Sequence, residues 1–118
     1  LAVRAPIPDG ALTDVTADLN QDVTVESVNS AFRAAAEGRM KGILAYSEDP
    51  LVSIDIVGDP HSSIIDAEST VVLNDRTVKV LAWYDNEYGF ACRMVDTAAF
   101  LSRQGLPEKK AMKAQVRA

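Results

Sequence analysis

Hydrophobic and polar residues alternate along residues 11–19, and this alternation predicts a β-strand. Successive side chains of a strand point to opposite faces of a sheet, so a period of two indicates one buried face. The preceding Pro6 and Pro8 favour an extended entry into this strand, because their rings fix the backbone. The residues expected to face the core are Ala11, Val15, Ala17 and Leu19.

Two segments carry apolar residues at the spacing of an α-helix. In the first, Thr24 can cap the N-terminus and Gly38 can end the helix. The second begins at Phe90 and is ended by Gly105 and Pro107. Each segment places its apolar side chains within one stripe, which is typical of a helix that covers a core. The stripes consist of Val25, Val28, Ala31, Phe32 and Ala35 in the first helix, and of Ala91, Met94, Val95, Ala98 and Leu101 in the second.

Further segments predict more strands. Residues 43–46 form a short apolar run, and residues 51–57 alternate apolar and polar side chains. Residues 70–73 and 77–84 are rich in β-branched and aromatic side chains. Between them, residues 74–76 have the length and polarity of a hairpin loop, so we predict that these last two strands pair antiparallel.

The order of the predicted elements, β-α-β-β-β-α, indicates the α+β class. We expect an antiparallel sheet that two helices cover on one face. The last strand is apolar on both parities near its end, where Leu81 and Trp83 alternate with Ala82 and Tyr84. One covered face does not suffice for such a strand, so we expect the other face to contact another protein surface, such as a second subunit.

Composition narrows the class of protein. The 118 residues are 47% hydrophobic and 25% charged, which fits one globular domain rather than a multidomain enzyme. The formal net charge of -5 argues against nucleic-acid binding, and no apolar run is long enough to span a membrane. A single cysteine and a single histidine exclude an internal disulfide and a Cys/His metal cluster, and this composition suits the cytosol. Because the chain does not begin with Met, we expect that a preceding segment has been removed.

Each polar residue that could take part in binding or catalysis could instead have a purely structural role. We expect His61 to bond loop backbone, because its neighbouring serines cannot generally complete a catalytic triad with it. Cys92 falls inside the second helix, where a free thiol is typically buried. Arg4 suits either bidentate binding of a phosphate or carboxylate, or a surface ion pair. Asn86 could cap the second helix, or pair its carboxamide with an amide of a ligand.

Taken together, four motifs in order resemble the C-terminal third of phosphorylating glyceraldehyde-3-phosphate dehydrogenase. They are VRAPIP at residues 3–8, KGILAYSEDP at 41–50, DPHSSIID at 59–66 and KVLAWYDNEYGF at 79–90. The run WYDNE at residues 83–87 is close to diagnostic of that family. The resemblance extends over residues 1–104, which would be the C-terminal portion of that family's catalytic domain. Residues 105–118 form a tail to which the resemblance assigns no role.

The resemblance implies a fragment of a cytoplasmic homotetramer of glycolysis. That enzyme converts glyceraldehyde 3-phosphate, NAD and inorganic phosphate to 1,3-bisphosphoglycerate. This part of the sequence does not distinguish NAD from NADP as the coenzyme. Arg4 matches the family's phosphate-binding arginine, and Asn86 matches the asparagine that bonds the nicotinamide carboxamide. Phe90 stands where the family has a tyrosine near the nicotinamide, so ring packing can persist without the hydroxyl.

The family's nucleophilic cysteine and its catalytic histidine precede the position of Arg4, and this chain lacks both motifs. It also lacks the glycine-rich segment that binds a dinucleotide. The resemblance therefore implies a missing N-terminal dinucleotide-binding domain and a fragment that is inactive alone. Two alternatives stay open: a fragment of erythrose-4-phosphate dehydrogenase, and a non-catalytic module that binds a protein through its exposed sheet face.

Overall fold

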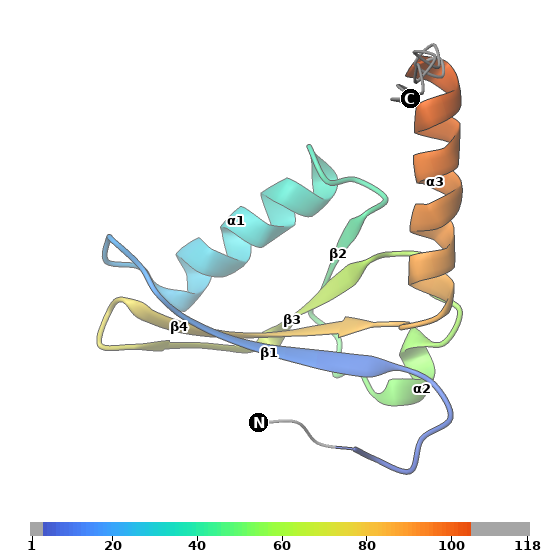
Figure 1. Cartoon of the computed structure of the whole chain (residues 1–118). Helices are drawn as coiled ribbons and strands as arrows, with labels where there is room; N and C mark the ends of the chain where they lie inside the picture. The colour runs from blue at the N-terminus through green and yellow to red at the C-terminus, as the bar shows by residue number, and fades with distance from the viewer. Residues whose placement is uncertain (1–3, 105–118) are drawn as a thin grey trace, which may run out of the picture.

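The computed structural model describes residues 4–104, which form the expected α+β fold (Figure 1). The strand predicted at residues 77–84 and the helix predicted after Thr24 are both present. The predicted tail at residues 105–118 lies outside the described residues. In chain order the elements are β1 (Ala11–Asp18), α1 (Val25–Glu37), β2 (Leu44–Ser47), α2 (Ser53–Ile56), β3 (Ser63–Leu73), β4 (Thr77–Tyr84) and α3 (Tyr88–Gln104).

The strands form one mixed sheet in the order β1-β4-β3-β2. β4 pairs antiparallel with β1 and with β3, whereas β2 runs parallel to β3. The expectation of a purely antiparallel sheet is therefore wrong at this edge. The reason lies in the connection, because residues 48–62 pass through α2 before β3 begins, and parallel neighbours require a crossover of this kind rather than a tight hairpin.

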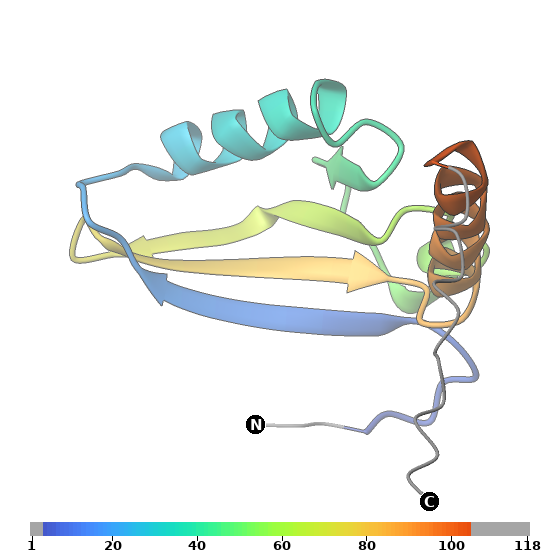
Figure 2. The ribbon, with the colours of Figure 1, turned by 45° about the horizontal axis from the view of Figure 1, so that its top comes forward.

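The core lies between α1 and one face of the sheet, as the layers in Figure 2 show. Of the predicted apolar stripe of α1, Val28, Phe32 and Ala35 pack against the buried cluster, whereas Ala31 is exposed. β1 has the predicted strand form, but α1 packs over β2 and β3, and Val15 of β1 is 47% exposed. The buried cluster consists of Leu44, Ile65, Val78, Val80 and Ala82.

The start of α1 is fixed by a reciprocal pair of hydrogen bonds. The Thr24 hydroxyl accepts from the Ser27 N–H at 3.2 Å, and the Ser27 hydroxyl accepts from the Thr24 N–H at 2.9 Å. Both N–H groups would otherwise lack a partner at a helix end. Local sequence therefore sets where α1 begins, and the apolar stripe sets which side of it faces the sheet.

The strand predicted at residues 51–57 is wrong, because this segment contains the short helix α2. In a strand Val52, Ile54 and Ile56 would share one face, but only Ile56 is buried, at 0% exposure, whereas Ile54 is 73% exposed. The Asp55 carboxylate accepts from the Val52 N–H at 2.9 Å and holds the first turn of α2. A side-chain acceptor near the N–H groups of a turn competes with strand pairing, and here it prevails.

β3 is longer than the strand predicted at residues 70–73, because it already begins at Ser63. Residues 64–67 are all buried, so both faces of the strand are covered and no period of two is visible. The pairing with β4 shifts between Asp66 and Val71, which marks a bulge in the strand.

α3 does not cover the sheet as predicted, and it projects from the end of the sheet where β4 finishes (Figures 1 and 2). The residues of its predicted apolar stripe are largely exposed, with Met94 at 59% and Val95 at 69%. Its contact with the rest of the fold is concentrated in its first turn, where Gly89 is buried. The spacing predicted the helix correctly, but spacing alone does not say which surface a stripe meets.

The second face of the sheet mixes apolar and charged side chains. Leu12, Leu81 and Trp83 lie on it, and Leu12 is 43% exposed. On the same face the Lys79 ammonium lies 2.9 Å from an Asp14 carboxylate oxygen. This face thus combines apolar side chains with one ion pair, and the subunit contact stays a prediction.

Candidate functional site

A hollow of about 250 Å³ lies where β4 ends and α3 begins, and we call it the turn hollow. It brings together Asn86 and Phe90, which are the two residues that the sequence analysis assigns to the nicotinamide. Its wall is completed by one residue of the loop before β3. The lining residues are Ser62, Tyr84, Asp85, Asn86, Gly89, Phe90 and Arg93.

Asp85 organises the turn that carries Asn86. Its side chain is buried, with the residue 2% exposed. One carboxylate oxygen, Oδ1, accepts from the N–H groups of Glu87 at 2.8 Å and Tyr88 at 2.7 Å. The other, Oδ2, accepts from the Gly58 N–H at 2.8 Å. The carboxylate thus caps the start of α3 and ties it to the loop after α2.

These hydrogen bonds set the charge of Asp85. The Gly58 N–H, followed by the Tyr88 N–H, holds the pKa of the carboxyl below its ordinary 3.8, because each N–H stabilises the ionised form. Burial acts in the opposite direction and is outweighed. The turn hollow therefore has a fixed negative charge in its floor at neutral pH.

Asn86 is exposed at the rim of the turn hollow. Within residues 4–104, no hydrogen bond involves its carboxamide, and the capping role that the sequence left open for it is filled by Asp85. A carboxamide offers both donors and an acceptor. The side chain is therefore available to a ligand amide.

Phe90 presents its ring at the same hollow from the first turn of α3 and is 65% exposed. An exposed ring beside a carboxamide suits a planar ligand that has one polar substituent, because the ring supplies apolar contact and the amide supplies direction.

Gly89 allows α3 to approach the loop before β3. A Cβ atom at this position would lie 2.7 Å from the backbone carbonyl oxygen of His61, which is closer than such contacts normally occur. Sequence reasoning missed this packing role and the capping role of Asp85. The available signal was an aspartate directly after the strand predicted at residues 77–84 and ahead of the second helix, a position that favours an Asx turn.

Arg93 forms the side of the turn hollow nearest the loop before β2. Its guanidinium donates to the Gly42 carbonyl oxygen at 3.1 Å and lies 2.7 Å from an Asp96 carboxylate oxygen. Its Nε is buried without a partner in the described part of the chain. Arg93 therefore links α3 to a second loop, one turn above Gly89.

Arg4 is exposed on the segment that leads into β1. The sheet register pairs Ala11 with Tyr84, so this segment joins the sheet at the end where Asn86 follows β4. Neither a hydrogen bond nor an ion pair of Arg4 occurs among the described residues. The structure thus brings Asn86 and Phe90 together, and it brings the segment of Arg4 only to the same end of the sheet.

His61 and Cys92 have structural surroundings. The His61 ring Nδ1 lies 2.8 Å from an Asp59 carboxylate oxygen, which also accepts from the His61 backbone N–H at 2.8 Å. The sequence analysis predicts a bond to the loop backbone, but the ring instead bonds the carboxylate of a loop residue. Cys92 is half-buried rather than fully buried. The described residues show no hydrogen bond between the two side chains.

A larger hollow of about 520 Å³ lies between α1 and β2. Its arginine, Arg33, forms an ion pair with Glu48 and lies over the ring of Tyr46, 4.9 Å from the centroid. The hydroxyl of Tyr46 and the charge of Glu48 raise the pKa of Arg33. This hollow contains none of the three residues that the sequence analysis assigns to substrate or coenzyme.

Residues 4–104 contain neither a membrane-spanning helix nor a cluster of metal ligands. Neither the length nor the apolar character of any helix there suffices to cross a membrane. The same residues contain no group of three or more His, Cys, Asp or Glu side chains placed to hold a metal ion.

Comparison with known proteins decides the family. The model of the glyceraldehyde 3-phosphate dehydrogenase C-terminal domain matches residues 1–86. The chain belongs to this family. The resemblance found in the sequence motifs is thereby confirmed, and Asn86 is the last residue of the matched range.

Relatives in this dehydrogenase family match most of the chain. Glyceraldehyde-3-phosphate dehydrogenase 1 of Bacillus cereus is 56% identical over 105 residues, which are 89% of this chain and 31% of the relative. The enzyme of Geobacillus stearothermophilus is 54% identical over 106 residues, which are 90% and 32%. That of Mycobacterium avium is 54% identical over 102 residues, 86% and 30%. The chain thus spans about a third of the length of these relatives.

Proposed function

We propose that this chain is the phosphate-binding and nicotinamide-orienting part of an enzyme that oxidises glyceraldehyde 3-phosphate with NAD and inorganic phosphate. The product would be 1,3-bisphosphoglycerate, and the setting would be glycolysis in the cytoplasm. The observation that carries the proposal is the position of Asn86, whose carboxamide lies at the rim of the turn hollow beside Phe90 and has no hydrogen bond to any described residue. The names of the relatives support glyceraldehyde 3-phosphate over erythrose 4-phosphate as the substrate.

Asn86 and Phe90 would receive the nicotinamide end of the coenzyme, which accepts the hydride when bound. The Asn86 carboxamide can donate to and accept from the nicotinamide carboxamide, and this pairing fixes which ring face meets the substrate. The Phe90 ring can pack on the nicotinamide but offers no hydroxyl. We assign residues of this chain only to the nicotinamide end of the coenzyme, which NAD and NADP share.

Arg4 would bind the phosphate of the substrate or inorganic phosphate. It is exposed and forms no ion pair with residues 4–104, which supports an available guanidinium, and the planar fork can bond two phosphate oxygens at once. The nucleophilic cysteine, its histidine base and the dinucleotide-binding domain would come from the upstream part of the polypeptide. We further propose a homotetramer in which the second face of the sheet contacts another subunit.

The test requires a completed enzyme, which we define as this chain joined to the preceding part of the Bacillus cereus relative. Asn86→Ala should lower the single-turnover rate of hydride transfer by roughly tenfold or more, because orientation is lost. Binding of ADP-ribose, which lacks the nicotinamide, should stay unchanged. Asn20→Ala, at an exposed asparagine between β1 and α1, is the matched control. Hydride transfer at the normal rate in Asn86→Ala would contradict the assigned role.

Arg4→Lys in the completed enzyme tests the phosphate site. A point charge replaces a fork, so KM for inorganic phosphate or for glyceraldehyde 3-phosphate should rise about tenfold, and coenzyme binding should not change. Arg39→Lys, at an exposed arginine beyond the end of α1, is the control. Unchanged KM and kcat would refute the role of Arg4. The same assays run with erythrose 4-phosphate compare the two candidate substrates directly.

A further inference from the structure

We propose that Asp85 is a positioning residue, which fixes the direction of the Asn86 carboxamide for hydride transfer. The inference rests on the function proposed above for Asn86. It extends that function by naming the group that aims the nicotinamide-binding side chain. Three hydrogen bonds hold the turn that carries Asn86, whereas none among residues 4–104 involves the Asn86 side chain itself.

The Asp85 carboxylate holds the backbone that follows Asn86. Asp85 precedes Asn86, and Asp85 Oδ1 accepts from the N–H of Glu87, the residue that follows. The Tyr88 N–H donates to the same oxygen at 2.7 Å, which closes a turn around Asn86. The peptide group between Asn86 and Glu87 cannot rotate without breaking the bond from the Glu87 N–H.

The third hydrogen bond connects this turn to the core. Asp85 Oδ2 accepts from the N–H of Gly58, which follows α2 by two residues. Gly58 has a positive φ of 80°, a conformation that side chains disfavour, and α2 is anchored by Ile56 at 0% exposure. The position of Asn86 relative to the sheet therefore depends on Oδ2 of Asp85.

The side chain of Asn86 has no hydrogen bond of its own within residues 4–104, so its aim depends on its backbone. An error of about 1 Å in a group that orients a reactant can cost roughly a hundredfold in rate. Asp85 does not need to touch the coenzyme to have such an effect. It would act through Asn86, and its removal should mimic the loss of Asn86.

The decisive variant is Asp85→Asn in the completed enzyme. The amide oxygen can still accept from Glu87 and Tyr88, but the amide nitrogen would face the Gly58 N–H, so the tie to the core is lost while the local turn is kept. The single-turnover rate of hydride transfer should fall roughly tenfold or more. KM for glyceraldehyde 3-phosphate and for inorganic phosphate, and the Kd of ADP-ribose, should stay within about twofold, because the variant leaves those contacts intact.

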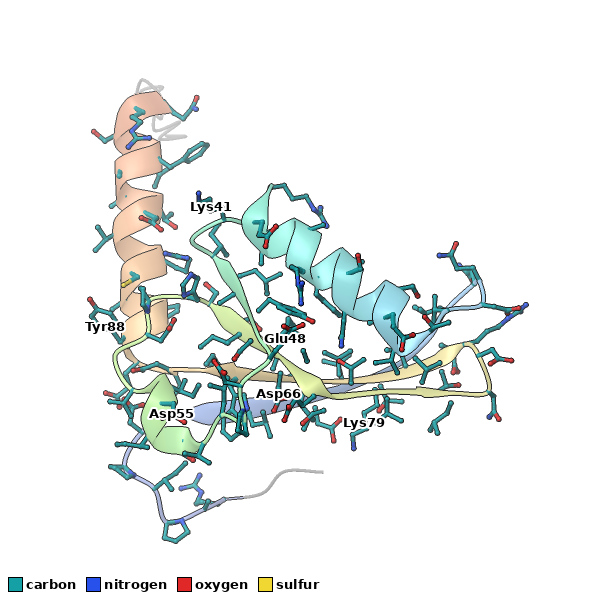
Figure 3. All side chains as sticks on the ribbon, turned by 180° about the vertical axis from the view of Figure 1, so that it is seen from behind. Lys41, Glu48, Asp55, Asp66, Lys79 and Tyr88 are labelled. Atoms are coloured by element: carbon teal, nitrogen blue, oxygen red, sulfur yellow. The ribbon has the colours of Figure 1, made fainter. Side chains whose placement is uncertain are left out.

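Two further variants separate positioning from simple stability. Asp85→Ser keeps a hydroxyl acceptor for the turn but is too short to reach Gly58, so it should behave as Asp85→Asn does. Asp66→Asn is the matched control, since Asp66 is 8% exposed and accepts from the Trp83 indole at 3.3 Å and the Ser69 N–H at 3.2 Å. Asp66 lies on the sheet, away from Tyr88 at the base of α3 (Figure 3). In Asp66→Asn the rate per folded molecule should be normal.

A double variant decides whether Asp85 acts through Asn86. If it does, adding Asp85→Asn to Asn86→Ala should slow hydride transfer little further, because the two losses are not independent. If the two rate losses multiplied in the double variant, the inference about Asp85 would be overturned. A normal rate in Asp85→Asn together with a slow rate in Asn86→Ala would also overturn it, while the function proposed for Asn86 would stand. A normal rate in Asn86→Ala would instead reject the function proposed for Asn86, and with it any need for a positioning residue.

Discussion

Hydrogen bonds and close packing determine which residue types fit around the turn hollow. Asp85 satisfies N–H groups from the start of α3 and from the loop after α2, and Gly89 lets the helix touch the backbone of His61. Asn86 lies between them in sequence, and its carboxamide forms no hydrogen bond within residues 4–104. The site therefore combines a rigid backbone with an available polar group, which is the arrangement that orients a ligand at little entropic cost.

The first prediction at this scale concerns the pH dependence of folding. The folded-state pKa of Asp85 is lowered below 3.8, so its carboxylate stabilises the fold at pH values above 3.8, and this contribution is lost as the pH falls through the folded-state pKa. Asp85→Asn should therefore lower the urea midpoint of the chain at pH 7, and this deficit should shrink below pH 4. Equilibrium unfolding in urea at pH 7 and below pH 4 measures this deficit. A deficit of equal size at every pH would contradict the assignment.

The second residue prediction is that Gly89→Ala destabilises the chain. Alanine normally stabilises a helix relative to glycine by about 1 kcal/mol. Here the added Cβ would meet a backbone carbonyl at 2.7 Å, which cannot move without shifting the loop. We expect a net loss of about 1–3 kcal/mol in the free energy of unfolding, as for other overpacked sites.

A control reports the ordinary helix preference. Ala98→Gly, at an exposed position of α3, should cost about 1 kcal/mol. Urea titrations should thus show a lower free energy of unfolding for both variants, although one replaces glycine by alanine and the other replaces alanine by glycine. A Gly89→Ala chain that is more stable than the original would show that the helix can move away from the loop.

At the scale of elements, stability is concentrated between α1 and the sheet. The apolar stripe of α1 packs on buried side chains of β2, β3 and β4, whereas α3 leaves most of its apolar side chains exposed. The turn hollow therefore lies at the border between a packed layer and a projecting helix. Asp85, Gly89 and Arg93 supply the bonds and close contacts that fasten α3 at this border.

Two isoleucines test this distribution. Ile65, on β3 beneath α1, is 4% exposed, so Ile65→Ala should lower the free energy of unfolding by about 2–5 kcal/mol through lost burial and a cavity. Ile54, on α2, is 73% exposed, and Ile54→Ala should change it by less than about 0.5 kcal/mol. Urea or thermal unfolding compares them. Equal effects would mean that the core does not lie between α1 and the sheet.

At the scale of the whole molecule, the structure has surfaces that the described residues leave uncovered. Phe90, Met94 and Val95 are each at least 59% exposed on α3, and the chain spans about a third of its relatives. We expect the upstream part of the polypeptide to cover this helix. Under the proposed function, Arg4, Asn86 and Phe90 would hold parts of a reaction whose nucleophile, base and dinucleotide site would come from that upstream part.

The corresponding prediction is that the isolated 118-residue chain has no dehydrogenase activity. Covalent catalysis needs an activated thiolate and a base, and the structure shows no hydrogen bond between Cys92 and His61, whose ring is already bonded to Asp59. The chain is incubated with NAD, phosphate and glyceraldehyde 3-phosphate, and the absorbance of the reduced coenzyme is followed, with the completed enzyme as positive control. Turnover that disappears in Cys92→Ser would overturn the prediction.

The sequence by itself determined the features that depend on neighbours along the chain. Helical spacing and the Thr24 cap specified α1, and β-branched residues around a polar loop specified the hairpin of β3 and β4. The motifs around Asn86 also sufficed to identify the family, because they preserve residue types in order. These signals survive because periodicity, capping and turn chemistry act over a few residues.

Only the tertiary structure decided the features that depend on distant segments. Residues 51–57 alternate as a strand does, yet Ile56 alone is buried and α2 forms, and residues 64–67 show no alternation because both faces of β3 are covered. The contact of Gly89 with His61 and the bond of Asp85 to Gly58 join residues 28 and 27 positions apart, as the numbering shows. Local patterns report which side chains favour burial, but the partner that buries or bonds them is set by how the whole chain packs.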